Sequence, residues 1–286
     1  MKLSLDSELK TIDHFVTMNE SQVTVKKGSV LERPLTLELT DQRTLEVTVE
    51  PNCEFTMIVD LRDAVMDGAT YDLSLDVAPN SQVSYVLLSE TPQLNVTINQ
   101  RIDVAKDAKV HVISAFLSES LDANITVRLN GVGSNVMMNA IAVSSLKQSQ
   151  VINVNMTHYA PYSFADMYNI GIANGQGRIV LNGVEKIEQG MTQANAFQTL
   201  KGIILSDSAI VEVNPILLID EYDVKAGHGA TIGKIEENQL YYLQSRGLTK
   251  DEAEKLIIHG YIKPILDEIK DETISKRLEA SIYQRL

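Results

Sequence analysis

The feature that most constrains this fold is a set of short polar turns that recur at nearly constant spacing. They begin at Pro51, Pro79, Lys106 and Gly131, which gives units of 28, 27 and 25 residues. Each turn is followed by runs of Val, Ile, Leu and Thr that alternate with polar residues, as in β-strands. Units of this size cannot bury their apolar faces alone and must stack on their neighbours. The spacing predicts a mainly β solenoid, with a two-sheet sandwich as the structural alternative.

Composition excludes several classes of function. The 286 residues are 44% hydrophobic and carry a formal net charge of -13. This charge argues against binding to nucleic acid, which depends on clustered Lys and Arg. No apolar run approaches the roughly 20 residues of a membrane-spanning helix, and the N-terminus has no signal-peptide pattern. We therefore expect a cytoplasmic protein that binds neither nucleic acid nor membrane.

The single cysteine, Cys53, cannot form an internal disulfide or supply the several thiolates of a structural zinc or stable iron–sulfur site. It lies beside apolar residues early in a predicted rung, where free cysteine behaves as a small buried hydrophobe. We expect no tightly bound cofactor in this chain alone.

The middle of the chain, residues 130–211, carries only four Lys or Arg and four Asp or Glu, but nine asparagines. A β surface with so little charge lacks the usual protection against edge-to-edge pairing, which indicates a covered or self-associating edge. Alternatively, the asparagines occupy the corners of the rungs and stack in ladders. The two interpretations are compatible.

A change of architecture is expected near residues 223–233. Gly227, Gly229 and Gly233 surround His228 there, which predicts a sharp backbone bend at a β-to-α hinge. Beyond this point the apolar pattern changes to a period near 3.6. A histidine at such a hinge is a candidate site.

The C-terminal pattern predicts three short helices. Gly247 is placed to end a first helix in the left-handed conformation, and Thr249 with Glu252 forms a capping box for a second. Pro264 should kink or end that second helix. Its predicted apolar face consists of Ala253, Leu256, Ile257 and Tyr261, and that of the third segment consists of Ile274, Leu278, Ser281 and Ile282. These helices either cap the open end of the solenoid or present a groove to another protein.

Residues 158–269 resemble the SufB/SufD family, the scaffold proteins of the Suf iron–sulfur cluster assembly machinery. The resemblance rests on the order and spacing of these motifs: His158-Tyr-Ala, Gln198, Leu205 to Ala209, Pro215-x-Leu217-x-Ile219, Asp223-Val224, His228-Gly-Ala-Thr231 with Gly233, and Tyr242-Leu243-x-Ser245-Arg246-Gly247. The first 150 residues match the family only in their β-rich character.

The resemblance implies a right-handed parallel β-helix core with a C-terminal helical domain and no catalytic site. The expected divisions are an N-terminal segment at 1–22, the β-helix at 23–233 and the helical domain at 234–286. Members of the family pair through their β-helices, and their C-terminal helices bind the ABC-type ATPase SufC. The residues expected to dock this ATPase are Tyr242, Leu243, Arg246, Leu256 and Tyr261.

The family pattern also assigns a role to His228, which matches a histidine of SufD-type members implicated in handling iron or a cluster at the dimer interface. A neutral imidazole is a suitable ligand for iron. Leu200 stands where SufB-type members carry a cysteine, and Gly229 replaces a SufB-type glutamate. The resemblance therefore implies either the SufD-like half of a heterodimer or a minimal homodimer, with iron or a cluster bound only transiently in the assembled complex.

Two other classes of β-helix protein remain as alternatives. Enzymes that act on polysaccharides need acids, or calcium with basic residues, along an exposed groove. The central β region offers few charges for such a site. A purely structural solenoid is the other alternative, against which the three predicted helices argue.

Overall fold

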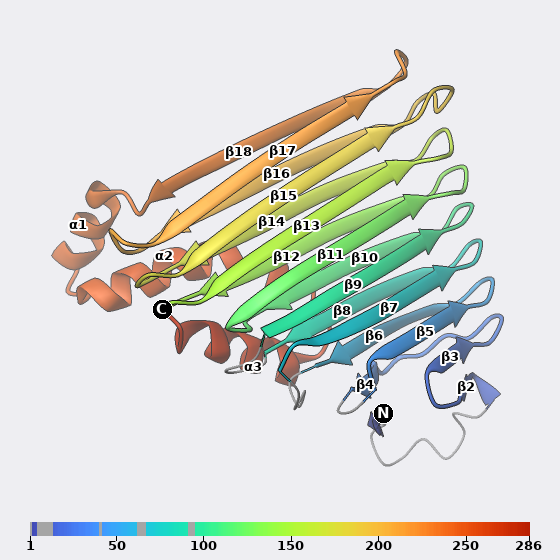
Figure 1. The fold of residues 1–286 in the computed structure, drawn as a ribbon, viewed down its shortest axis with the longest axis horizontal. Helices are drawn as coiled ribbons and strands as arrows, with labels where there is room; N and C mark the ends of the chain where they lie inside the picture. The colour runs from blue at the N-terminus through green and yellow to red at the C-terminus, as the bar shows by residue number, and fades with distance from the viewer. Residues whose placement is uncertain (1, 5–13, 40–41, 62–66, 91–94) are drawn as a thin grey trace.

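The computed structural model describes residues 2–4, 14–39, 42–61, 67–90 and 95–286. Within these ranges the strands form two nine-stranded sheets, drawn in Figure 1. Sheet A contains, in spatial order, β1 (Lys2–Ser4), β4 (Leu35–Glu38), β6 (Glu54–Asp60), β8 (Gln82–Ser89), β10 (Lys109–Phe116), β12 (Asn135–Ser144), β14 (Phe164–Ala173), β16 (Asn195–Ile204) and β18 (Lys225–Lys234). Sheet B contains β2 (Val16–Met18), β3 (Gln22–Val25), β5 (Thr44–Val49), β7 (Ala69–Val77), β9 (Asn95–Val104), β11 (Ser120–Leu129), β13 (Ser149–His158), β15 (Arg178–Ile187) and β17 (Ile210–Ile219).

The chain passes alternately between the two sheets, so each rung contributes one strand to each. From β3 and β4 onward, neighbouring strands in a sheet pair in parallel, as β10 does with β8 and β12. The N-terminal pairs β1–β4 and β2–β3 are antiparallel. This topology is a parallel β-helix, and it confirms the predicted solenoid rather than the sandwich.

The predicted turns lie at one end of the rungs and are stacked on one another. Asn52, Asn80 and Asp107 adopt φ angles of 63°, 59° and 55°, in the left-handed region that Asn and Asp tolerate better than most residues. Their backbone N–H groups donate to the carbonyl of the next turn along, as from Asn52 to Pro79 at 3.1 Å. The turns therefore form a continuous hydrogen-bonded column along this side of the β-helix.

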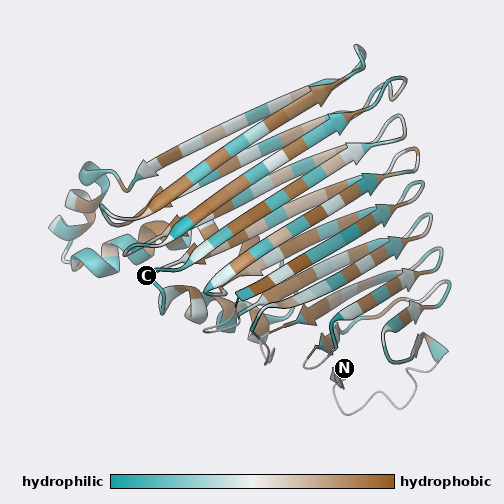
Figure 2. Ribbon diagram, viewed as in Figure 1, coloured by the Kyte–Doolittle hydropathy of each residue, from teal (hydrophilic) through white to brown (hydrophobic). Residues whose placement is uncertain are grey.

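Alternate residues of each strand fill the space between the sheets. β11 shows the alternation clearly: Leu121, Ala123, Ile125, Val127 and Leu129 are buried and the residues between them are more exposed. The same alternation of apolar and polar residues is visible along the strands in Figure 2. Because every inward side chain stacks on its equivalent in the next rung, the apolar core runs the length of the β-helix.

The asparagine ladder predicted from the sequence is present on the outer face of sheet B. Each side-chain amide donates to the carboxamide or carboxylate oxygen one strand away, over distances of 2.7–3.1 Å. The ladder consists of Asp72, Asn99, Asn124, Asn153, Asn182 and Asn214. It lies on the strands themselves, not at the corners of the rungs.

Three helices follow the last strand: α1 (Glu237–Ser245), α2 (Lys250–Leu266) and α3 (Glu272–Tyr283). Gly247 has φ of 98° just beyond α1, and Thr249 and Glu252 form both hydrogen bonds of a capping box. Pro264 lies within α2, two residues before its end. The predicted left-handed glycine after α1 and the capping box of α2 are confirmed, whereas α2 does not end at Pro264.

The α2 face that packs against the β-helix differs from the predicted one. Ala253 is buried as predicted, but Leu256 is 48% exposed, and the buried residues that follow are Ile258, Ile262, Ile265 and Leu266. Because α2 carries apolar residues on two sides, its sequence period did not decide which side packs. The predicted α3 face is confirmed, with Leu278 and Ile282 buried.

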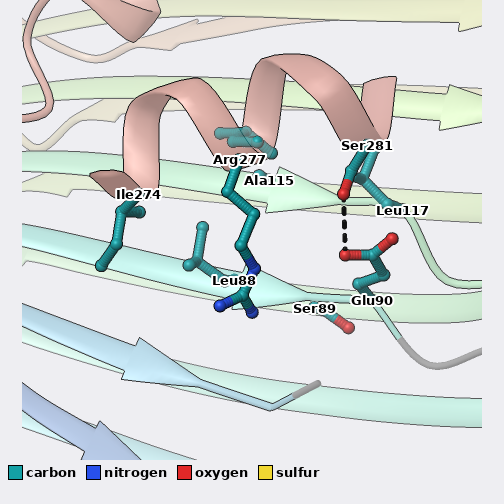
Figure 3. A pocket seen from close by; sticks show the side chains of 9 residues that line it. Leu88, Ser89, Glu90, Ala115, Leu117, Ile274, Arg277 and Ser281 are labelled. Carbon is teal, nitrogen blue, oxygen red and sulfur yellow. Dashed lines mark hydrogen bonds between the residues drawn. The ribbon is translucent and has the colours of Figure 1, made fainter. Parts of the chain in front are cut away.

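The helices α2 and α3 cover the outer face of sheet A, where they lie beside the strand ends in Figure 1. Isoleucine, leucine and valine side chains there form a second core with the helices, including Ile113, Ile141 and Ile170. Polar contacts at its border hold α3, as Figure 3 shows: Ser281 donates to Glu90 at 3.1 Å, around a small cavity lined by Leu88 and Leu117. Arg285 pairs with Glu90 at 3.0 Å.

Candidate functional site

The candidate site lies at the end of the β-helix formed by β17 and β18. These are the last strands of their sheets, at the end opposite the N-terminal strands in Figure 1. The predicted bend at Gly227, Gly229 and Gly233 is wrong: all three belong to β18, a continuous ten-residue strand, and none has a positive φ. Parallel pairing with β16 extends this segment, and the turn into α1 comes only after Lys234.

His228 is exposed on this last strand of sheet A. It pairs in register with Gln198 of β16, so the two side chains share the inner face of the sheet. Gln198 is buried, and its Nε2 donates to the carbonyl of Ile216 across the core at 2.8 Å. His228 therefore lies at the open end of the β-helix, one rung beyond the buried side chain of Gln198.

Along one edge, both last strands present backbone groups that pair with no other strand of the described residues. The N–H of Ile210 donates to Gly177 at 2.9 Å and that of Asp220 to Ile187 at 3.0 Å. Because N–H groups alternate in direction along a strand, the odd-numbered residues of β17 point theirs away from the sheet. Pro215 is one of these residues, so its missing N–H costs no hydrogen bond within the sheet. In β18, Lys225 donates to Ala194 at 3.0 Å, so the N–H of His228 points to the open edge.

Apolar side chains surround this end of the molecule. The exposed ones include Ile210, Ile216, Leu218, Ile219, Tyr222 and Ile232. The inward side chains Val213, Pro215 and Leu217 are half-buried, because no further rung covers them. This end has the composition of a solenoid core that ends without a polar capping rung.

A buried carboxyl group, Glu185, lies one rung inside this end and was not singled out by the sequence. Its inward position on β15 leaves it fully buried, and neither carboxyl oxygen has a hydrogen-bond partner among the described residues. Burial, and secondarily the charge of Asp166, raises the pKa of Glu185 to about 9. The side chain is therefore neutral at pH 7. In the sequence, the alternation along β15 places Glu185 at an inward position, and this pattern could have identified it.

Gly183, two residues before Glu185, makes room for the amide of Gln198. A Cβ atom at Gly183 would lie 2.9 Å from both Gln198 Oε1 and Met167 Sδ. Gln198 Oε1 has no hydrogen-bond partner among the described residues. Glu185, Gln198 and His228 are thus three polar side chains at inward positions of the last rungs.

His158 is fully buried and has a local structural role. Ser163 Oγ donates its hydrogen to Ala160 at 2.7 Å, so it accepts from Nδ1 of His158 at 2.7 Å. This arrangement assigns the imidazole proton to Nδ1. Burial lowers the pKa of His158 to about 4, so the ring is neutral at pH 7. The pair closes the turn between β13 and β14.

The side chains predicted to dock an ATPase divide into two groups. Tyr242 is 56% exposed and Leu256 48% exposed, Arg246 is exposed, and Leu243 is half-buried. α1 as a whole has no buried residue. Tyr261, in contrast, packs towards the β-helix, where its ring lies against Lys201 of β16.

No group of three His, Cys, Asp or Glu side chains that could hold a metal is found in the described part of the chain. Cys53 is buried, with its Sγ 3.1 Å from the carbonyl oxygen of Lys26, and burial raises its pKa. In the described part of the chain, no helix is long and apolar enough to cross a lipid bilayer.

Comparison with known proteins agrees with this architecture. Residues 37–261 match a family profile described as SUF system FeS cluster assembly, SufBD core domain. The iron–sulfur cluster assembly protein SufD of Bacillus subtilis is 36% identical over 161 residues, which cover 56% of this chain and 37% of that protein. SufD of Escherichia coli is 28% identical over 231 residues, which cover 80% of this chain and 54% of that protein. The chain thus covers less than two thirds of either relative. Because the family profile matches well over half of the chain, this protein belongs to the SufB/SufD family of iron–sulfur cluster assembly proteins.

Proposed function

We propose that this chain is a scaffold subunit of a Suf-type iron–sulfur cluster assembly complex, without catalytic activity of its own. It dimerises through the β17–β18 end and docks a SufC-like ABC ATPase through its helices. The observation that carries the proposal is the open end itself, where two strand edges without a partner in the described part of the chain lie beside exposed apolar side chains.

Pairing at this end would satisfy the exposed backbone and cover the apolar side chains in one step. A second β-helix could continue either sheet, because outward N–H and C=O groups are available along β17 and β18. The partner is a second copy of this chain or a SufB-type chain. Leucine at position 200, fully buried, supplies no metal ligand, so cluster chemistry at that position would depend on a SufB-type partner.

We place the ATPase-docking surface on the helices because their outward-facing side chains do not pack against the β-helix. Tyr241, Tyr242 and Leu256 are exposed large apolar side chains on α1 and α2. Arg246 lies 5.3 Å from the centroid of the Tyr242 ring, which gives the surface an aromatic and a cationic group together. Tyrosine and arginine are enriched at the energetic centres of protein interfaces.

His228 is proposed to handle iron or a nascent cluster at the dimer interface. It stands on the edge strand with an exposed imidazole, so a ligand held there would lie between the two chains. The group bound there is substrate or cargo of the assembly reaction, held only while the complex is formed.

Light scattering on a size-exclusion column tests the proposal, first with the chain alone and then with the SufC-like ATPase of the same source. A dimer that gains two ATPase copies supports a homodimeric scaffold, and a chain that binds one ATPase but stays single points to a SufB-type partner. Leu256→Arg should abolish ATPase binding, whereas Ile216→Arg should disrupt only dimerisation. Absence of ATPase binding by the unaltered chain would contradict the docking role of the helices.

A further inference from the structure

Three side chains bring metal-ligating atoms together where α2 meets α3. Nδ1 of His259, in α2, lies 2.7 Å from Oε1 of Glu279 and 2.8 Å from the phenolic oxygen of Tyr283, both in α3. The phenolic oxygen is itself 3.1 Å from Oε1 of Glu279. One nitrogen and two oxygens therefore form a closed triangle, here called the His259 triangle.

The two helices hold this arrangement in place. Glu279 and Tyr283 are four residues apart in α3 and so project from the same face of the helix. His259 approaches from α2, with its ring tilted 35° to that of Tyr283. Metal–ligand bonds of about 2.0–2.2 Å place neighbouring ligand atoms about 3 Å apart. The edges of the His259 triangle already have this length, so a small ion could bind at it without movement of the backbone.

The His259 triangle is accessible, and two nearby lysines along α2 and α3 pair with other carboxylates. The side chains of His259 and Glu279 are 32% and 30% exposed. Lys263 and Lys276, one turn away in α2 and α3, form ion pairs of 2.7 Å with Asp267 and Glu272. Hydrogen bonds within the triangle also fasten α2 to α3, and this structural role alone is the competing explanation.

We propose that His259, Glu279 and Tyr283 form a binding site for ferric iron. Phenolate and carboxylate are hard oxygen donors that suit a highly charged ion, and imidazole is a common iron ligand. On binding, the phenolic proton of Tyr283 passes to solvent and the imidazole proton moves from Nδ1 to Nε2, while the oxidation state of the iron is unchanged. Three protein ligands leave the remaining positions to water or a small chelator. The site is separate from His228 and goes beyond the proposed scaffold function.

Titration of the full-length chain with ferric nitrilotriacetate tests the site. We expect one iron per chain and a visible charge-transfer band from phenolate to iron, with tyrosinate vibrations in the resonance Raman spectrum. Tyr283→Phe should abolish the band, and His259→Ala and Glu279→Gln should weaken iron binding at least tenfold by equilibrium dialysis. Tyr159→Phe, which changes an exposed tyrosine outside the helices, should keep the band.

A missing band in the unaltered chain, or a band that persists in Tyr283→Phe, would overturn the assignment. Far-UV circular dichroism and thermal unfolding check that Tyr283→Phe still folds. If Tyr283→Phe does not fold, the assignment is tested by whether His259→Ala weakens iron binding, and unchanged binding would overturn it. Failure here is distinguishable from failure of the scaffold proposal, because assembly with the ATPase is measured separately by light scattering.

Discussion

The Nζ atom of Lys201 in β16 lies 3.6 Å from the centroid of the Tyr261 ring in α2. This contact connects a helix proposed to dock the ATPase with a strand one position from the open edge of sheet A. It therefore joins α2, which carries part of the proposed docking surface, to the strand next to the proposed dimer edge. A cation over an aromatic face contributes about 0.5–2 kcal/mol.

Tyr261→Leu should lower the free energy of unfolding by about 1–2 kcal/mol, because it removes the cation–π contact and part of the second core. Tyr261→Phe keeps the ring and should cost much less. Urea denaturation followed by circular dichroism measures both, with the exposed Tyr242→Leu as the matched control. An equal loss in the two Tyr261 variants would show that the ring contact with Lys201 contributes little.

Glu185 should make the protein less stable as pH rises. Its folded-state pKa is raised to about 9 from the ordinary value of 4.5, so the folded chain keeps a proton that the unfolded chain loses. The free energy of unfolding therefore falls through the window from about pH 4.5 to 9, by about 1.4 kcal/mol per unit at most. Glu185→Gln should remove this dependence, so the two proteins should diverge most clearly between pH 6 and 8 in denaturant titrations. Parallel curves across that range would contradict a neutral buried carboxyl.

Gly183→Ala should destabilise the last rungs, because the added methyl group meets Gln198 Oε1 and Met167 Sδ at 2.9 Å. Overpacking of this kind costs about 1–3 kcal/mol. Shortening the opposing side chain in the double variant Gly183→Ala/Gln198→Ala should recover part of the loss, measured by thermal unfolding. If the two losses simply add, the two residues do not share the space described above.

Glu90→Ala should loosen α3 from the β-helix. Glu90 accepts from Ser281 at 3.1 Å and pairs with Arg285 at 3.0 Å, and both contacts are partly buried. Their loss should cost about 2 kcal/mol of local stability. Hydrogen–deuterium exchange should then increase in α3 while the central strands stay protected. Lys276→Ala is the control, because its ion pair with Glu272 is exposed and lies within α3. Unchanged exchange in Glu90→Ala would mean that the apolar contacts alone hold the helix.

Local signals in the sequence determined much of this protein. The turn at Asn52 and its equivalents needs residues that tolerate a left-handed backbone, and the capping box at Thr249 is closed by hydrogen bonds over three residues. The alternation of apolar and polar residues fixed which side chains point inward. These features depend on neighbours along the chain, so the solenoid, its rung length and the caps of the first two helices followed from the sequence.

Only the tertiary structure decided the features that depend on pairing between distant segments. Parallel pairing with β16 makes β18 a straight strand, although its glycines would also permit a bend. Stacking in the second core selects the Ile258 side of α2 over the Leu256 side. The burial of Glu185 and the meeting of His259 with Tyr283 likewise arise from strand register and helix packing. Such contacts join residues whose separation in sequence carries no periodic signal, so their energies appear only once the chain is folded.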